Sequence, residues 1–247
     1  MIKLLERTIY AHGGLDRSKG FRYLKAKIKA DGAIWAMKGQ PGIFYDVDVS
    51  VDLLKQEIEL TTDQFRATYS PDNILALTEI GKPVQELTAP RSSFAEYGKA
   101  ETWTWLQAIY FLGYTLWSHV QVPILFLKPG FHVIALGPWR EKKGETWQRL
   151  QVNFPDNIAA HSRSQTFYIG RDGLIKRQDY QMDIAGGTPI AQYLEDYVQV
   201  PPFRLPTILR AYVRKEDNMP MLDQPLLVSI HQSNLQPVPV NKVKQHF

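Results

Sequence analysis

The chain has no cysteine, which excludes a disulfide framework, a cysteine nucleophile and thiolate metal ligands. It also has no G-x-S-x-G nucleophile elbow, no G-x-x-x-x-G-K phosphate loop and no G-x-G-x-x-G dinucleotide fingerprint. The sequence therefore gives no support to an α/β hydrolase, a nucleotide-driven enzyme or a dehydrogenase, and it predicts no cofactor.

Metal-ligand spacing is absent as well. No two histidines stand at i, i+2 or i, i+4 spacing, and no H-E-x-x-H motif occurs. A metal site would have to be assembled from distant segments, and none is predicted. The histidines are His12, His119, His132, His161, His231 and His246.

Like charges do not gather in long runs. The 29 lysines and arginines are scattered among 25 acidic residues, and the net charge is +4. Lys25, Lys27 and Lys29 alternate with apolar residues, which is typical of the solvated face of a strand rather than of a phosphate-binding patch. No nucleic-acid partner is predicted.

Targeting signals are absent at the start of the sequence. Met1 to Arg7 lack the long apolar core and the small-residue cleavage site of a signal peptide. We therefore expect a cytoplasmic location.

Charged residues are also missing from 102–127, a stretch long enough to span a bilayer. Polar residues such as Gln107 and His119 lie inside it, and Pro123 interrupts it. A buried or lid helix from Thr102 to His119, followed by an extended apolar segment, fits these features better than a membrane span. No integral membrane insertion is expected.

What the sequence does contain is alternation of apolar and polar residues, which indicates strands with one buried and one wet face. In 24–30 and 45–52 this alternation is regular, and Gly32 and the segment 39–42 separate the two runs as turns. An amphipathic helix is predicted before them, from Ile2 to His12. Further strands are predicted at 55–61, 65–69, 74–80, 149–154, 164–169, 174–184, 190–198, 206–214 and 225–233.

A sheet with one wet face must bury its other face against something, and the large apolar partner is the region 102–136. The predicted fold is mainly β (α+β): a curved antiparallel half-barrel sheet wrapped around a helical lid or plug. We expect one domain over 1–240, with a helical insertion at about 102–136, and a flexible tail at 241–247.

Three stretches of this chain are similar to the LolA/LppX-like half-barrel family. They are the N-terminal helix running into His12–Asp16, the strand–turn–strand segment Phe167–Tyr180, and Asp196-Tyr197 leading to Phe203–Thr207. The resemblance implies a convex sheet, an apolar concave face, helices that close the opening, and a lipid or another hydrophobic ligand. Carriers of this family are typically exported, and this chain shows no export signal.

Candidate acid–base residues are His161, His119 and Tyr180. His161 stands at the entry to a strand, as either an exposed loop histidine or a proton-transfer group. His119 ends the apolar helix. It is either a histidine at a helix C-terminus, where positive charge is favoured, or a polar group that faces the pocket. Tyr180 shares a strand face with Met182 and Ile184. Candidate ligand-binding residues are Trp35, Tyr45, Trp105, Trp117, Trp139 and Arg140.

Arg177 and Asp179 lie on the opposite face of the Tyr180 strand. They are interpreted as a solvated ion pair. Arg140 follows the apolar region and is a candidate to pair with a ligand carboxylate, or simply to cap a loop.

The sequence thus predicts a protein that binds a hydrophobic small molecule or lipid in an apolar cavity between sheet and helix. The alternative is a biosynthetic enzyme, of cyclase or isomerase type, acting in the same cavity by shape control and acid–base catalysis. A third hypothesis is membrane docking through Trp103, Trp105 and Trp117. The oligomeric state is not predicted.

Overall fold

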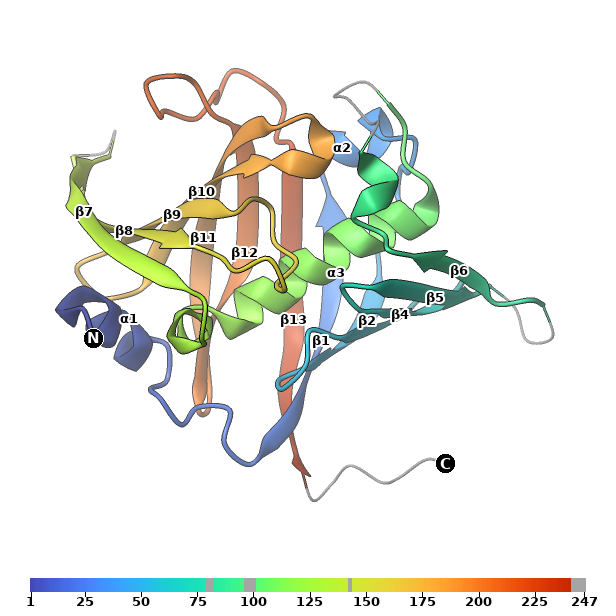
Figure 1. The fold of residues 1–247 in the computed structure, drawn as a ribbon, viewed down its shortest axis with the longest axis horizontal. Helices are drawn as coiled ribbons and strands as arrows, with labels where there is room; N and C mark the ends of the chain where they lie inside the picture. Colours follow the sequence, from blue (N-terminus) through green and yellow to red (C-terminus); the bar gives the residue numbers. More distant parts are fainter. Residues whose placement is uncertain (79–81, 96–100, 142–143, 241–247) are drawn as a thin grey trace.

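A computed structural model describes residues 1–78, 82–95, 101–141 and 144–240. These residues form one antiparallel sheet of 13 strands, in the order β6-β5-β4-β3-β2-β1-β13-β12-β11-β10-β9-β8-β7 (Figure 1). Because β1 pairs with β13, the first and last strands of the chain join two wings, β2–β6 and β7–β12.

Eleven of the thirteen strands overlap ranges predicted from the sequence, whereas those at 85–88 and 132–140 were not predicted. The strands are β1 (Phe21–Asp31), β2 (Val47–Asp52), β3 (Ile58–Thr61), β4 (Arg66–Tyr69), β5 (Asn73–Leu77), β6 (Gln85–Thr88), β7 (His132–Arg140), β8 (Thr146–Asn153), β9 (Ser164–Ile169), β10 (Ile175–Met182), β11 (Thr188–Val200), β12 (Phe203–Val213) and β13 (Val228–Pro239). The helices of the described residues are α1 (Lys3–Ala11), α2 (Ala33–Met37), η1 (Ser92–Phe94), α3 (Trp105–Gln121), η2 (Ile124–Leu127) and η3 (Asp183–Ala185).

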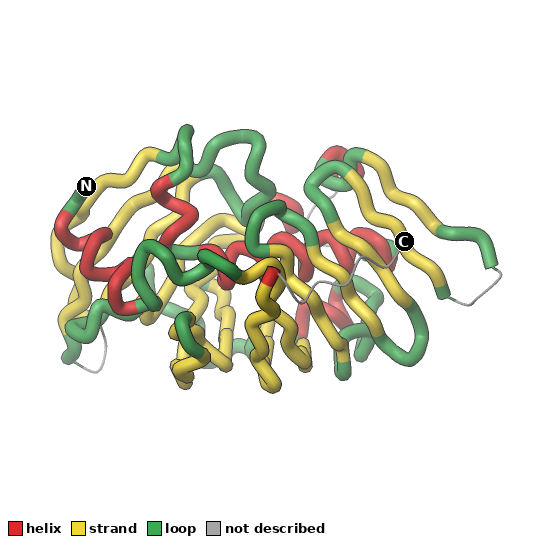
Figure 2. Tube along the Cα trace, turned by 90° about the horizontal axis from the view of Figure 1, so that it is seen from below, coloured by secondary structure: helices red, strands yellow, loops and turns green. Residues whose placement is uncertain are grey.

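Helix α3 connects one edge of the sheet to the other and lies in the trough between the two wings (Figure 2). Every residue of α3 after Trp105 is buried. A helix whose apolar residues face all sides needs to be enclosed, and the curved sheet supplies that enclosure. The predicted curved half-barrel around a helical plug is confirmed.

Both ends of α3 are closed by side chains, because a buried helix leaves unpaired N–H groups at its start and unpaired carbonyls at its end. Thr104 and Gln107 form a capping box at the start. At the end, the guanidinium of Arg17 donates hydrogen bonds to the carbonyls of Val120, Gln121 and Val122, at 2.7, 2.9 and 2.9 Å. Arg17 is itself 2% exposed, and its burial lowers its pKa to about 10.

The close fit of α3 against the sheet depends on Gly113. A β-carbon at this position would lie 2.4 Å from Cγ of Tyr69, a fully buried residue of β4. The absent side chain is therefore what lets the helix backbone approach the ring.

Two sequence predictions differ from the structure in detail, and one is not tested. The helix begins at Trp105 and ends at Gln121, later than Thr102 and His119, because the capping box sets its start. Residues 132–136, expected within the helical insertion at about 102–136, belong to the edge strand β7. The predicted tail 241–247 lies outside the described residues.

No helix in the described part of the chain combines the length and the hydropathy needed to cross a membrane.

The interpretation of Arg177 and Asp179 as a solvated pair is wrong. Both side chains point away from α3, to the face that we call the outer face, yet the Arg177 side chain is 0% exposed and that of Asp179 is 6% exposed. The β7–β8 hairpin, through Glu141, and the segment after β12, through the carbonyl of Asn218, bond to Arg177 and cover it.

We expect Gly113→Ala to lower the free energy of unfolding by about 1–2 kcal/mol, because overpacking against a rigid buried ring outweighs the gain in helix propensity. Chemical denaturation measures the change. Gly137→Ala is the matched control, since nothing lies within 4 Å of a β-carbon added there. Equal stability of the two variants would contradict the close approach.

Replacing Arg17 should affect the whole fold. We expect Arg17→Met to lower the free energy of unfolding by about 3–5 kcal/mol, because several buried carbonyls lose their donor. Arg17→Lys retains one donor group, so its free energy of unfolding should lie between those of the unmodified protein and Arg17→Met. Arg171→Met, at an exposed arginine, is the control for lost charge. A small effect of Arg17→Met would mean that water caps the helix instead.

Candidate ligand-binding site

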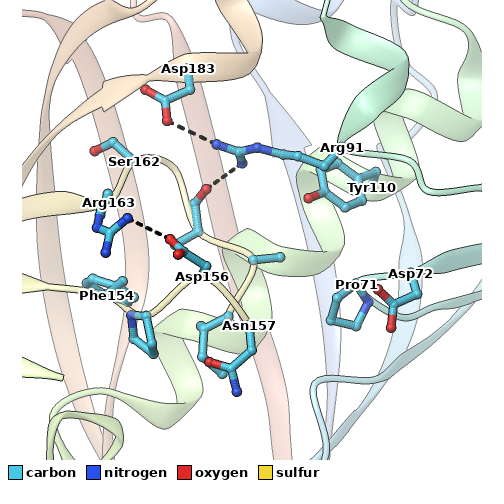
Figure 3. A pocket seen from close by; sticks show the side chains of 14 residues that line it. Pro71, Asp72, Arg91, Tyr110, Phe154, Asp156, Asn157, Ser162, Arg163 and Asp183 are labelled. Carbon is cyan, nitrogen blue, oxygen red and sulfur yellow. Dashed lines mark hydrogen bonds and ion pairs between the residues drawn. The ribbon is translucent and has the colours of Figure 1, made fainter. Parts of the chain in front are cut away.

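A pocket of about 460 Å³ opens where the two wings face each other across α3 (Figure 3). It lies between the segment connecting β8 to β9, residues 154–163, and the turn at Pro71 and Asp72 between β4 and β5. We call residues 154–163 the bridging loop. The side chains that line the pocket beyond these two segments are Arg91, Tyr110 and Asp183.

The bridging loop is held by the opposite wing. Gln56, between β2 and β3, donates from Nε2 to the carbonyl of Ala159 at 2.7 Å and accepts from the Ala159 N–H at 3.0 Å. The loop closes on itself through the Phe154 N–H, which donates to the carbonyl of Arg163 at 2.8 Å. The two wings are therefore joined across the open side of the half-barrel.

Arg91 makes a second connection beside the pocket. It donates from Nη1 to the carbonyl of Ala160 at 2.6 Å and from Nη2 to Oδ2 of Asp183 at 3.0 Å, as Figure 3 shows. Burial raises the pKa of Asp183, and Arg91 opposes that shift. We call this pair of contacts the Arg91 clasp.

Beneath the bridging loop, a buried polar chain contains the three predicted acid–base residues. His161 accepts from or donates to the Tyr114 hydroxyl through Nδ1 at 3.2 Å, and it stacks on Tyr180 with ring centroids 3.7 Å apart. The Tyr180 hydroxyl donates to Oε1 of Gln192 at 3.0 Å, and the Gln192 amide bonds to Nε2 of His119.

His119 and His161 are both held neutral. Nδ1 of His119 donates to the carbonyl of Thr115 at 2.6 Å, which leaves Nε2 to accept from Gln192. Burial lowers the pKa of His119 to about 4, and it lowers the pKa of His161 well below its usual value.

Two polar atoms near this chain have no hydrogen-bond partner among the described residues. They are Nε2 of His161 and Oγ of Ser118. Such buried atoms carry a desolvation cost of about 1–3 kcal/mol each, which a water or a polar ligand atom removes. The buried polar chain formed by Tyr114, His161, Tyr180, Gln192 and His119 can therefore accept a polar group, but none of its five side chains is charged.

Of the predicted ligand-binding tryptophans, Trp35 and Trp117 lie in the core, and the partly buried Trp105 packs against it. Trp35 packs edge-on against Phe111 of α3 at 5.7 Å. Trp117 donates from Nε1 to the carbonyls of Asp52 and Lys55, and Trp105 donates to Gln85. None of the three lines the pocket.

The other three predicted ligand-binding residues lie away from the pocket too. Tyr45 is 65% exposed, with the ammonium of Lys29 over its ring. Trp139 packs on Arg177 at the outer face, and Arg140 is exposed on β7.

Sequence reasoning did not identify Arg91, Tyr110 and Asp183 as pocket residues. Arg91 stands in an irregular segment without periodicity, and only the fold brings it to Asp183. Tyr110 carried a usable signal, since Tyr110, Tyr114 and Ser118 recur every four residues and so share one face of α3.

No family model matches the chain, and no curated protein matches it in sequence. Solved structures do match its fold. A DUF1329 family protein from Desulfovibrio piger is 10% identical, with a TM-score of 0.54 over 95% of this chain and 92% of that one.

Two further structures belong to the same comparison. A LolA superfamily protein from Nitrosomonas europaea is 8% identical, with a TM-score of 0.52 over 95% of this chain and 91% of that one. An outer membrane lipoprotein-sorting protein domain from Vibrio parahaemolyticus is also 8% identical, with a TM-score of 0.54 over 98% of this chain and 93% of that one. This chain has a distant LolA-like fold.

The buried histidines should make stability depend on pH. The pKa of His119 is about 4 in the folded protein and 6.5 in the unfolded protein. As the pH falls from 6.5 toward 4, only the unfolded state takes up this proton, so the free energy of unfolding decreases over that range. We expect His119→Gln to remove about 2 kcal/mol of the stability loss between pH 7 and pH 5. Denaturant titrations at both pH values measure this, with exposed His132→Gln as control. A pH dependence unchanged by His119→Gln would contradict the neutral histidine.

Proposed function

We propose that this protein binds an amphipathic, lipid-like molecule, with its polar group in the pocket and its apolar part against α3 and the inner face of the sheet. The observation that carries the proposal is the position of the pocket. It opens at the gap between the wings, and Tyr110 of α3 lies in its wall. An apolar chain that enters there meets Tyr110 and the core between α3 and the sheet.

Uptake requires the opening to widen, because the inner face is filled by α3. The Arg91 clasp and the contact between Gln56 and Ala159 are the polar connections that would release. The partnerless Nε2 of His161 supports this proposal, because it supplies a polar site beneath the loop. The ligand would then combine a hydrogen-bonding group with an apolar chain.

The comparison structures support a carrier only by analogy of fold, since fold does not fix function. One of them is described as a lipoprotein-sorting domain, and that description concerns the Vibrio protein.

The enzyme alternative rests on one observation, namely that His161, Tyr180 and His119 lie within one buried polar chain. No comparison supports a cyclase or an isomerase. Membrane docking and a cytoplasmic location stay predictions from the sequence. Trp103, 2% exposed, and Trp117, 1% exposed, are buried and so not available for docking in this conformation.

The proposal predicts that organic-solvent extraction of the purified protein yields a lipid-like compound, measured by mass spectrometry. It also predicts uptake of a pyrene-labelled fatty acid by protein freed of lipid. Arg91→Met should speed uptake roughly fivefold to tenfold, because it removes a hydrogen bond and a half-exposed ion pair worth about 1 kcal/mol or slightly more together.

Arg171→Met is the control, because Arg171 is exposed and does not line the pocket. It should leave the uptake rate unchanged. An empty extract together with no uptake at any concentration would refute lipid binding. Equal acceleration of uptake by both variants would refute the role of the Arg91 clasp, but not lipid binding.

A further inference from the structure

A second pocket, of about 600 Å³, lies on the outer face of the sheet. Tyr193 of β11 lines it, whereas Gln192 beside it points to the opposite face and bonds to His119 of α3. Because neighbouring strand residues point to opposite faces, this pocket is separated from the site described above by the thickness of the sheet.

Three aromatic rings form a row in this pocket. Trp147 of β8 contacts Tyr193 edge-on at 6.5 Å, and Tyr193 contacts Tyr212 of β12 edge-on at 6.2 Å. Trp and Tyr combine a flat apolar face with a polar edge. Such a row suits a ligand whose faces are apolar and whose rim is polar.

The buried Arg177 makes this row rigid. Its guanidinium lies 5.6 Å from the ring centre of Tyr193 and 4.7 Å from that of Tyr168. Asp179 at 2.6 Å and Glu141 at 3.2 Å compensate its charge. Arg177 therefore fixes the aromatic wall but offers no free charge to a ligand, and a preorganised wall reduces the entropic cost of binding.

Four of the eight charged residues that line the pocket form ion pairs with one another, and Glu141 pairs with Arg177. Glu195 bonds to Arg210 across β11 and β12, and Lys176 bonds to Asp172 at 2.7 Å. A charged ligand that binds at Glu195 and Arg210 would have to break their pair. A neutral ligand with several hydroxyl groups would not, because one hydroxyl can donate to the carboxylate while the next accepts from the guanidinium.

We propose that the outer pocket is a binding site for a neutral saccharide. The C–H face of a pyranose ring would lie on the aromatic row, and neighbouring hydroxyls would bond to Glu195 and Arg210. The volume lies in the range of about 300–1,000 Å³ typical of small-molecule sites. This inference is independent of the lipid proposal, because the two pockets lie on opposite faces.

Saturation-transfer NMR tests the proposal with glucose, galactose and N-acetylglucosamine, and with cellobiose, maltose and chitobiose. We expect transfer to the ring protons of at least one sugar. Tyr212→Ala should weaken its binding at least tenfold, and Glu195→Gln severalfold. Tyr45→Ala, at an exposed tyrosine outside this pocket, should leave binding unchanged.

Choline, spermidine and glycerol 3-phosphate complete the panel. Binding of one of these and of no sugar would overturn the proposal in favour of a charged ligand, and so would no binding at all. If Tyr212→Ala does not fold, Glu195→Gln still decides, because its side chain is 41% exposed. Uptake of the labelled fatty acid should be the same in all three variants, so failure of either proposal can be recognised separately.

Discussion

The fold depends on the closure of helix α3 at both ends. A buried, mainly apolar helix can fill the trough of the sheet only if its last carbonyls find donors. Arg17 donates to three of these carbonyls, and it also donates to the carbonyl of His12 at 3.1 Å, just after α1. One side chain thus connects α1, the entry to β1 and the end of the central helix. The two wings can enclose α3 because side chains satisfy the polar groups at both ends of its backbone.

The sequence predicted the architecture because alternation and uniform hydrophobicity are local signals. Regular alternation at 24–30 located β1, and the uncharged stretch 102–127 located α3. The strand at 132–140 was missed because its residues do not alternate between buried and exposed. This strand lies at the edge of the sheet, and neither of its faces is fully covered. The burial of Arg177 could not be predicted, since Glu141 and Asn218, which cover it, lie far away in the sequence.

The candidate site was predictable only in its polar interior. The sequence pointed to His119 at the end of the apolar helix, His161 at a strand entry and Tyr180 on an apolar strand face, and the fold buries all three and brings them together. Their neutrality follows from complete burial, which the sequence does not reveal. The clasp formed by Arg91 and Asp183 depends on two irregular segments meeting across the gap between the wings, and no periodicity marks such a meeting. Aromatic residues were a weaker guide, because tryptophan serves the core as readily as a ligand.

An open sheet has two free edges, and β7 forms one of them. A long edge with a regular row of unpaired N–H and carbonyl groups invites the strand of another chain, and from there aggregation. The pairing of β7 with β8 shifts register between Leu136 and Trp139, where Gly137 and Pro138 stand. Proline has no N–H to offer, and the irregularity bends the strand. The edge therefore presents two short, misaligned pieces, and the half-barrel can remain open without recruiting a neighbour.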